Sequence, residues 1–244
     1  MKKLFLSLVL ISVAIFLLGF FLAPSLGIDI QDYLFANANG GNFCPKGDGK
    51  SFNDELAVQV NKNISLPDRY VPKDLVNISK DVRSSYRICL KKDVLKNLIK
   101  MFDDASLENI NLAVTSGFRS SETQSTLYKA LMLLKGEKAK DRIAEPLHSE
   151  HQLGTTLDIS GKSINYISAS DKFDGTAEDL WLRANAYKYG FVLSYPKNKT
   201  EITGYDYEPW HYRFLGTEIA KKIFDQKISV QEYFNDQKES SKNL

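Results

Sequence analysis

Cysteine and histidine are scarce in this sequence of 244 residues, which contains two cysteines and three histidines. Cys44 and Cys89 could form one disulfide in an oxidising compartment, or they could remain two buried thiols. The scarcity of histidine restricts any metal centre, because few places in the chain can supply an imidazole ligand. Most residues that could bind a catalytic metal fall in three short segments, which are 116–119, 149–158 and 208–211.

The sequence also lacks a strong charge of either sign. It has 32 basic and 30 acidic residues, which gives a formal net charge of +2 at pH 7. No basic tract and no RNA- or DNA-binding pattern is present, so we expect no nucleic-acid partner. The absence of internal repeats disfavours an adaptor built from repeated binding modules.

A long apolar run is present near the N-terminus. Lys2 and Lys3 precede residues 4–22, which carry no charge, and the next charged residue is Asp29. A run of this length is sufficient to cross the hydrocarbon core of a bilayer as a helix. We therefore expect a membrane anchor whose positive end stays in the cytoplasm, with the remainder of the chain exported.

A cleaved signal peptide is the alternative for this segment. Signal peptides have a shorter apolar core, of roughly 7–15 residues, followed by a site with small side chains. Ala23 and Ser25 provide an imperfect version of such a site. The length of the run favours the anchor, and we predict an extracytoplasmic protein tethered to the cell membrane, or a secreted one if the segment is cleaved.

The rest of the chain is long enough for one domain of ordinary size with its own hydrophobic core. The expected organisation has four parts, which are a membrane anchor or signal peptide at 1–28, a flexible linker at 29–50, a single domain at 51–235 and a polar tail at 236–244. The linker prediction depends on the many asparagine and glycine residues of that segment.

Apolar spacing predicts a mixture of helices and short strands. Helices are expected at 92–107, from Ser120 or Ser121 through Leu134, at 179–189 and at 217–224, and strands at 110–114, 155–159, 191–194 and 207–214. Pro209 has no backbone donor, so the last strand should lie at a sheet edge or contain a bulge. Because these elements do not alternate as regular βαβ units, the sequence predicts an α+β fold with a small antiparallel sheet flanked by helices.

Two histidines and one aspartate form the candidate metal centre. His151 and Asp158 lie seven residues apart, and a turn at Gly154 followed by a strand would direct both side chains to one point. His211 would arrive from the separate strand near Pro209. Two neutral imidazoles and one carboxylate leave one position of a tetrahedral Zn²⁺ open for water, which is typical of a catalytic zinc site. We expect the small sheet to carry this site.

Glu208 and Arg119 complete the candidate chemistry. Glu208 lies three residues before His211 and is the natural general base for a water bound to zinc. Arg119 has a planar guanidinium that suits a substrate carboxylate or the negative charge of a tetrahedral intermediate. Each residue taken alone is more often structural or solvated, and the prediction depends on their joint occurrence.

The three segments resemble the motifs of the VanY family of D-alanyl-D-alanine carboxypeptidases, within the wider group of lysostaphin-type, D-Ala-D-Ala and hedgehog-type zinc proteins. The matching motifs are Ser116-Gly117-Phe118-Arg119-Ser120, Ser149-Glu150-His151 with Gly154 and Asp158, and Glu208-Pro209-Trp210-His211. The likeness covers about residues 64–216 in matching order. It implies a bacterial zinc metallopeptidase that removes the C-terminal D-alanine from peptidoglycan stem peptides.

The resemblance implies roles for particular residues. Zinc would be the cofactor, with His151, Asp158 and His211 as its ligands and Glu208 as the catalytic base. The implied substrate-binding residues are Arg119, Gln124, Ser149 and Trp210. The implied partners are the peptidoglycan stem peptide and, through the N-terminal segment, the bacterial cell membrane.

Three alternatives stay open at this level. The same centre could act as an L,D-carboxypeptidase on tetrapeptide stems or as a peptidoglycan endopeptidase, because only the shape of the pocket separates these reactions. Hedgehog-type relatives imply a non-catalytic zinc-binding module, which the presence of Glu208 and Arg119 disfavours. The chain departs from the family pattern at Leu147, where glycine is common, so the loop there could differ. We expect the neighbouring His148 to lie beside the site and not to be a ligand.

Overall fold

The computed structural model describes residues 44–47, 56–84 and 87–242 of the chain. The predicted membrane segment at 1–28 lies outside the described residues, and so does most of the predicted linker at 29–50. Within the described ranges, no helix has both the length and the apolar character needed to cross a membrane.

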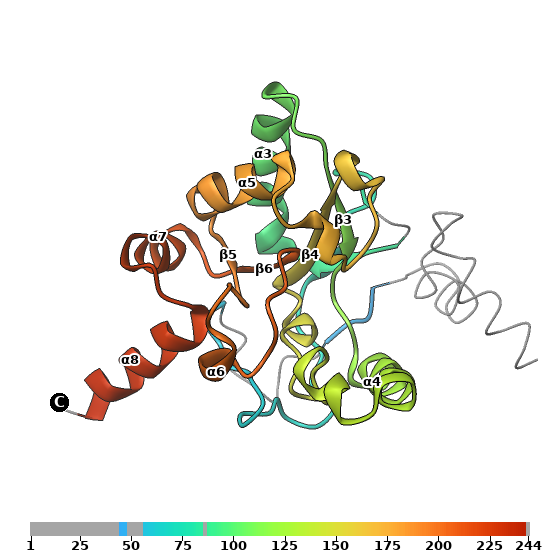
Figure 1. The fold of residues 1–244 in the computed structure, drawn as a ribbon, viewed down its shortest axis with the longest axis vertical. Helices are drawn as coiled ribbons and strands as arrows, with labels where there is room; N and C mark the ends of the chain where they lie inside the picture. Colours follow the sequence, from blue (N-terminus) through green and yellow to red (C-terminus); the bar gives the residue numbers. More distant parts are fainter. Residues whose placement is uncertain (1–43, 48–55, 85–86, 243–244) are drawn as a thin grey trace, which may run out of the picture. The chain divides into compact units, whose positions relative to one another are not determined.

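Two antiparallel sheets and several helices make up the described domain (Figure 1). The strands are β1 (Leu75–Asn77), β2 (Cys89–Lys91), β3 (Leu112–Ser116), β4 (Thr156–Gly161), β5 (Phe191–Leu193) and β6 (His211–Phe214). The α-helices are α3 (Lys92–Leu107), α4 (Ser121–Lys135), α5 (Ala177–Asn185), α6 (Thr200–Thr203), α7 (Thr217–Gln226) and α8 (Val230–Lys242). Strands β1 and β2 pair with each other, and the larger sheet has the order β3-β4-β6-β5. The predicted α+β fold with a small antiparallel sheet is confirmed.

Local signals account for the two helices that flank β3. Helix α3 has the bounds that its apolar spacing predicts, and α4 begins after Ser120, whose hydroxyl accepts a hydrogen bond from the backbone N–H of Thr123 at 3.3 Å. Strand β3 begins two residues later than predicted. The reason is that the backbone N–H of Ile110 still bonds to the carbonyl of Ala105, so this residue lies in the turn that follows α3.

Successive side chains of β4 and β6 point alternately to the hydrophobic core and to the candidate site. One face of these strands packs into the main core cluster together with α3 and α5, and it carries Leu157, Ile159, Tyr212 and Phe214. Figure 1 shows α3 and α5 on the same side of the larger sheet. Asp158 and His211 alternate with these apolar residues, so their side chains lie on the opposite face, away from α3 and α5.

The C-terminal helices form a second, smaller core cluster. Val230 and Phe234 of α8 pack with Ala220 and Ile223 of α7. The predicted polar tail at 236–244 begins inside α8, which continues to Lys242. The side chains at the start of this tail are exposed, as their polar composition suggests.

The prediction for Pro209 was wrong. Strand β6 lies in the interior of the larger sheet, between β4 and β5, and not at an edge. Pro209 precedes the strand, in a turn where the backbone N–H of His211 bonds to the carbonyl of Glu208 at 3.1 Å. Because the proline lies outside the ladder, its missing N–H removes no bond between strands.

The sequence left open whether the two cysteines form a disulfide or remain buried thiols, and the structure shows the disulfide. Cys44 and Cys89 form a disulfide across a sequence separation of 45 residues. Cys89 belongs to β2, and its carbonyl accepts the backbone N–H of Phe118 at 2.8 Å. The disulfide therefore ties the N-terminal part of the described chain to the strand that supports the 116–119 segment.

Candidate metal centre and active site

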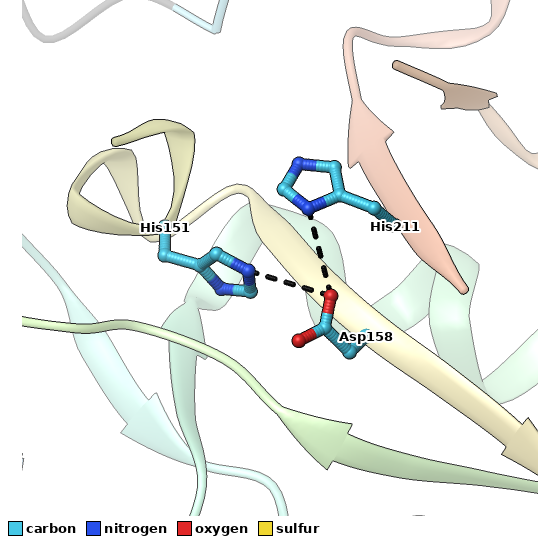
Figure 2. Close-up of side chains that lie close together, drawn as sticks. All are labelled: His151, Asp158 and His211. Atoms are coloured by element: carbon cyan, nitrogen blue, oxygen red, sulfur yellow. Dashed lines mark ion pairs between the residues drawn. The ribbon is translucent and has the colours of Figure 1, made fainter. Parts of the chain in front are cut away.

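Three different elements bring the predicted zinc ligands together. Asp158 and His211 are register partners across β4 and β6, so they face each other on neighbouring strands. His151 lies in a short 3-10 helix, Glu150–Leu153, that ends at Gly154 in a left-handed conformation with φ of 70°. This turn leads directly into β4, as predicted. Figure 2 shows both imidazoles directed at the same carboxylate oxygen of Asp158.

The donor atoms have the spacing of a tetrahedral metal site. Oδ1 of Asp158 lies 3.4 Å from Nε2 of His151 and 3.6 Å from Nδ1 of His211, and the three ligand atoms all lie within 4.8 Å of one another. Zinc–ligand bonds of about 2.0–2.2 Å place neighbouring tetrahedral ligands roughly 3.4 Å apart. Oδ1 of Asp158 is buried and has no hydrogen-bond donor among the described residues. This oxygen and the two nitrogens therefore fit a zinc ion.

The orientation of His151 is set by a backbone carbonyl. Its Nδ1 lies 2.7 Å from the carbonyl oxygen of Gly117, so an N–H at this position leaves the lone pair of Nε2 directed at Asp158. Gly117 is needed for close packing and not for a left-handed turn, since it is absent from the residues with positive φ. A Cβ added there would lie 2.5 Å from Cγ2 of Ile88 and 2.8 Å from the carbonyl oxygen of Cys89.

A buried chain of polar groups holds the ring of His211. Its Nε2 lies 3.0 Å from Oε2 of Glu150, and Oε1 of the same carboxylate lies 3.0 Å from Nη1 of Arg213. Arg213 is fully buried and also donates to the backbone carbonyl of Val58. Such outer partners of a ligating histidine determine which nitrogen carries the proton and raise the basicity of the ring.

Glu150 and Arg213 were not among the residues predicted to form the site. A local signal was available for Arg213, because it follows His211 by two residues and alternate residues of a strand share one face. Glu150 offered only its position beside His151. The contact of Glu150 with His211, which is 61 residues away in sequence, appears only in the folded chain.

Burial and neighbouring charges set the protonation states of the three candidate ligands in the metal-free protein. Burial, together with the charge of Arg119, lowers the pKa of His151 to about 4, so this imidazole is neutral at pH 7. Burial opposes ionisation of Asp158, but His151, His211 and Arg119 outweigh it and lower the pKa of the carboxyl. Burial also opposes the charge of His211, yet Glu150 and Glu208 raise its pKa to about 10.

Glu208 is buried beside the cluster. Its Oε2 lies 3.4 Å from Nδ1 of His211, and its backbone N–H bonds to the carbonyl of Tyr195 at 3.1 Å. Burial raises the pKa of its carboxyl. Glu208 lines the same cavity as the three candidate ligands, and its carboxylate can accept a proton there.

Arg119 and Gln124 form a connected polar pair next to the cluster. Nη1 of Arg119 donates to Oε1 of Gln124 at 2.9 Å, and Nη2 lies 3.8 Å from Oδ2 of Asp158. Gln124 is held in turn by a hydrogen bond from its Nε2 to the carbonyl of Ala144 at 2.6 Å. Ser149 lies close by and caps the turn of His151, whose backbone N–H it accepts at 3.3 Å.

One cavity of about 290 Å³ joins these groups. Its walls include all eight residues of the predicted site, which are Arg119, Gln124, Ser149, His151, Asp158, Glu208, Trp210 and His211. The walls also include Arg142, Tyr195 and Tyr205, which our sequence analysis did not single out. His148 does not line this cavity, and its Nδ1 lies 2.7 Å from the carbonyl oxygen of Asn61.

A buried His-Asp-His cluster beside a buried glutamate, on a small antiparallel sheet flanked by helices, defines a metallopeptidase. The sequence model of the family described as "VanY: D-alanyl-D-alanine carboxypeptidase" matches residues 87–217, which is more than half of the chain. The chain belongs to this VanY family.

Known proteins agree with this membership. The chain is 41% identical over 188 residues to YodJ of Bacillus subtilis (strain 168), a protein whose assignment as a carboxypeptidase is provisional, and the match covers 74% of this chain and 67% of YodJ. The matched region spans 66% and 57% of two D-alanyl-D-alanine carboxypeptidases, from Enterococcus faecalis and Enterococcus faecium.

Two solved structures are similar in both sequence and fold. The LdcB LD-carboxypeptidase has 41% sequence identity and a TM-score of 0.70, with coverage of 75% of this chain and 86% of that chain. A variant of the vancomycin-resistance D,D-pentapeptidase VanY in complex with Zn(II) has 30% identity and a TM-score of 0.62, with coverage of 75% and 99%.

Proposed function

We propose that this protein is a zinc-dependent D,D-carboxypeptidase that removes the C-terminal D-alanine from peptidoglycan stem peptides. The observation that carries the proposal is the convergence of His151, Asp158 and His211 with Glu208 and Arg119 around one cavity. The similarity to a D,D-pentapeptidase solved with Zn(II) supports both the metal and the reaction.

His151, Asp158 and His211 would hold the metal. When bound, Zn²⁺ supplies a Lewis acid for the scissile carbonyl and lowers the pKa of the attacking water from about 15.7 toward about 7. The buried carboxylate of Glu208 takes a proton from this water and later delivers it to the leaving amine. A neutral His151 and an ionised Asp158 are the protonation states that this ligand set requires.

The arginine–glutamine pair would select a free C-terminus. The side chain of Arg119 is only 12% exposed, and its partner Gln124 is buried. A charge-assisted pair with the terminal carboxylate of the substrate is worth more in such a site than in water. The buried Ser149 and Trp210 complete the wall of the cavity beside this pair.

We place the protein outside the cytoplasm, attached to the bacterial membrane through residues 1–28, with residues 29–50 as a linker and residues 51–235 as the catalytic domain. The apolar run at 4–22 supports this proposal. The Cys44–Cys89 disulfide supports it as well, because disulfides persist mainly in oxidising compartments.

The test uses the full-length protein, purified in detergent, and defined stem peptides. We expect release of D-alanine from a pentapeptide stem, its loss with a chelator and its recovery when zinc is restored. Mass spectrometry identifies the product and separates a carboxypeptidase from an endopeptidase. Release that persists without metal, or no release after zinc is restored, would contradict the proposal.

An L,D-carboxypeptidase is the second candidate. It is favoured by the similarity to the LdcB LD-carboxypeptidase, which has 41% sequence identity and a TM-score of 0.70 to this chain. A tetrapeptide stem supplied beside the pentapeptide separates the two, because both reactions release D-alanine but from stems of different length. Faster release from the tetrapeptide would make this second candidate the function.

Substitution of the base tests its role within either reaction. We expect Glu208→Ala to retain zinc, since Glu208 is not among the three grouped ligand residues. Turnover should fall by about 10²–10⁴-fold, the usual contribution of a general base. Glu201→Ala, at an exposed position of α6, is the control and should keep wild-type turnover. Unaltered turnover in Glu208→Ala would show that Glu208 is not the general base.

A further inference from the structure

Tyr207 is the residue immediately before Glu208, and its side chain lies in a polar network that does not line the cavity. Its hydroxyl accepts a hydrogen bond from Nη2 of Arg183 and lies 2.9 Å from Oδ1 of Asp174. The guanidinium of Arg183 also lies over the tyrosine ring, with its Cζ 5.5 Å from the ring centroid. The hydroxyl and the ring are therefore both held.

The partners of Tyr207 are themselves held firmly to α5. Nε of Arg183 donates to Oδ1 of Asp179 at 2.8 Å, and Nη2 donates to Oδ2 at 2.7 Å, which is a bidentate pair with a fully buried carboxylate. Asp179 also accepts the backbone N–H of Gly175 at 2.8 Å. Asp174 receives a further hydrogen bond from Lys197 at 2.7 Å. The network therefore offers Tyr207 a fixed point of attachment.

The segment that carries Glu208 lies outside regular secondary structure. Residues 204–210 lie between α6 and β6, and their backbone is bonded to other elements at Asp206, whose N–H bonds to the carbonyl of Asp141 at 2.8 Å, and at Trp210, whose carbonyl accepts the N–H of Ile159 at 2.9 Å. Glu208 itself makes two backbone hydrogen bonds, from its N–H to Tyr195 and from His211 to its carbonyl. The Tyr207 hydroxyl adds a link from this segment to α5.

We propose that Tyr207 is a positioning residue. It holds the 204–210 segment so that the carboxylate of Glu208 faces the candidate metal site formed by His151, Asp158 and His211. The inference rests on the proposed function, in which Glu208 is the base. Tyr207 contacts Arg183 and Asp174 while the adjacent Glu208 contacts His211, so we expect loss of the Tyr207 contacts to shift Glu208 through their shared backbone. Catalysis is sensitive to such shifts, because a misplacement of about 1 Å can cost about 10²-fold in rate.

The simpler view is that this network only stabilises the domain. Arg183 and Asp174 are partly exposed, and a single hydrogen bond of this kind makes only a modest net contribution to stability. A structural role would change the denaturation midpoint but not turnover by the folded enzyme. Turnover and local backbone exchange at Glu208 therefore separate the two views.

Tyr207→Phe removes the hydroxyl and keeps the ring. Tyr189→Phe is the matched control, because the hydroxyl of Tyr189 likewise bonds to a carboxylate, Oδ2 of Asp104 at 2.7 Å, and Tyr189 does not line the cavity. We expect Tyr207→Phe to lower kcat about tenfold, within the range for misplaced groups, with KM and zinc content unchanged. Tyr189→Phe should keep wild-type kcat.

Amide hydrogen exchange of the zinc-loaded full-length protein gives a readout that needs no substrate. The amide of Glu208 should exchange faster in Tyr207→Phe than in wild type and be unchanged in Tyr189→Phe. Unaltered exchange in Tyr207→Phe, or a loss of kcat shared equally by both variants, would overturn the inference. A wild-type protein without peptidase activity would count against the proposed function, while the exchange result would still decide whether Tyr207 positions the segment.

Discussion

His211 and Glu150 form a buried pair in which Nε2 of the imidazole lies 3.0 Å from Oε2 of the carboxylate. The other ring nitrogen, Nδ1, lies 3.6 Å from Oδ1 of Asp158. Nε2 of the ring therefore contacts Glu150, and Nδ1 is directed at the candidate metal position beside Asp158. Because the second carboxylate oxygen of Glu150 is bonded to Arg213, the position of the ring depends on the whole chain of contacts.

Glu150→Gln should weaken zinc binding about 10–100-fold, the usual effect of removing an outer partner of a ligating histidine. The amide of the variant still accepts a hydrogen bond but lacks the charge that makes His211 basic. Zinc affinity is measured by competition with a chromophoric chelator. Glu178→Gln is the control, because Glu178 is equally buried but accepts its hydrogen bonds from Ser163. Equal zinc affinity in the two variants would contradict the role of Glu150.

Zinc affinity should depend steeply on pH. Burial opposes protonation of His211, but Glu150 and Glu208 raise its pKa to about 10 in the metal-free protein. Below this pH a proton must leave the ring before the metal binds, so affinity should rise about tenfold per pH unit between about pH 7 and 9. Chelator competition across this range measures the slope. A flat profile would show that His211 binds no proton in the metal-free state.

The raised pKa of His211 also makes the stability of the metal-free protein depend on pH. The folded-state pKa of His211, about 10, lies above the unfolded value of about 6.5. Its contribution to the stability of the metal-free protein is therefore fully present below about pH 6.5 and is lost as the pH rises toward 10. Chemical denaturation of the chelated protein at several pH values is the measurement, and a midpoint that rises over this range would contradict the assignment.

Leu147 adopts a left-handed backbone with φ of 69°, at the position where the family pattern commonly has glycine. A residue with a Cβ pays about 1–2 kcal/mol in this conformation, and glycine does not. Leu147→Gly should therefore be more stable than Leu147→Ala by about 1 kcal/mol, since both variants remove the same leucine contacts. Urea denaturation compares them, and an alanine variant that is as stable as the glycine variant would show that the loop relaxes.

The Cys44–Cys89 disulfide should contribute about 4 kcal/mol to stability, from the loop-closure entropy of its 45-residue separation. The double variant Cys44→Ser, Cys89→Ser should lose most of this amount in denaturant titrations. Reducing agent should lower the stability of the wild type to a similar level and leave the double variant unchanged. A loss below about 1 kcal/mol would mean that the unfolded chain is already compact in this region.

The candidate ligand set could be selected from the sequence because its parts lie in short motifs. His151, Gly154 and Asp158 are within eight residues, and a turn followed by a strand is a local structure with local signals. The bounds of α3 were likewise predictable from apolar spacing, and the start of α4 from a capping serine at 120 or 121, of which the structure shows Ser120. Residues of these motifs also line the cavity, as their chemistry suggested.

Predictions that depend on partners far along the chain were weaker. Pro209 was assigned to an edge strand or a bulge because its nearest neighbours in sequence give no sign that β6 starts two residues later, inside the sheet. The need for glycine at position 117 likewise comes from its close packing against Ile88 and Cys89. In both cases the deciding contact comes from a separate element.

The sequence by itself determined which donor atoms are available and which short segments carry them, since side-chain chemistry and local turns depend only on neighbouring residues. Only the tertiary structure decided that Asp158 and His211 are cross-strand partners, that Glu150 lies against the far side of His211, and that neighbouring charged groups shift the pKa values of both residues against the effect of burial. Strand register and burial are properties of the whole packed domain, because each depends on contacts between residues that are distant in the chain.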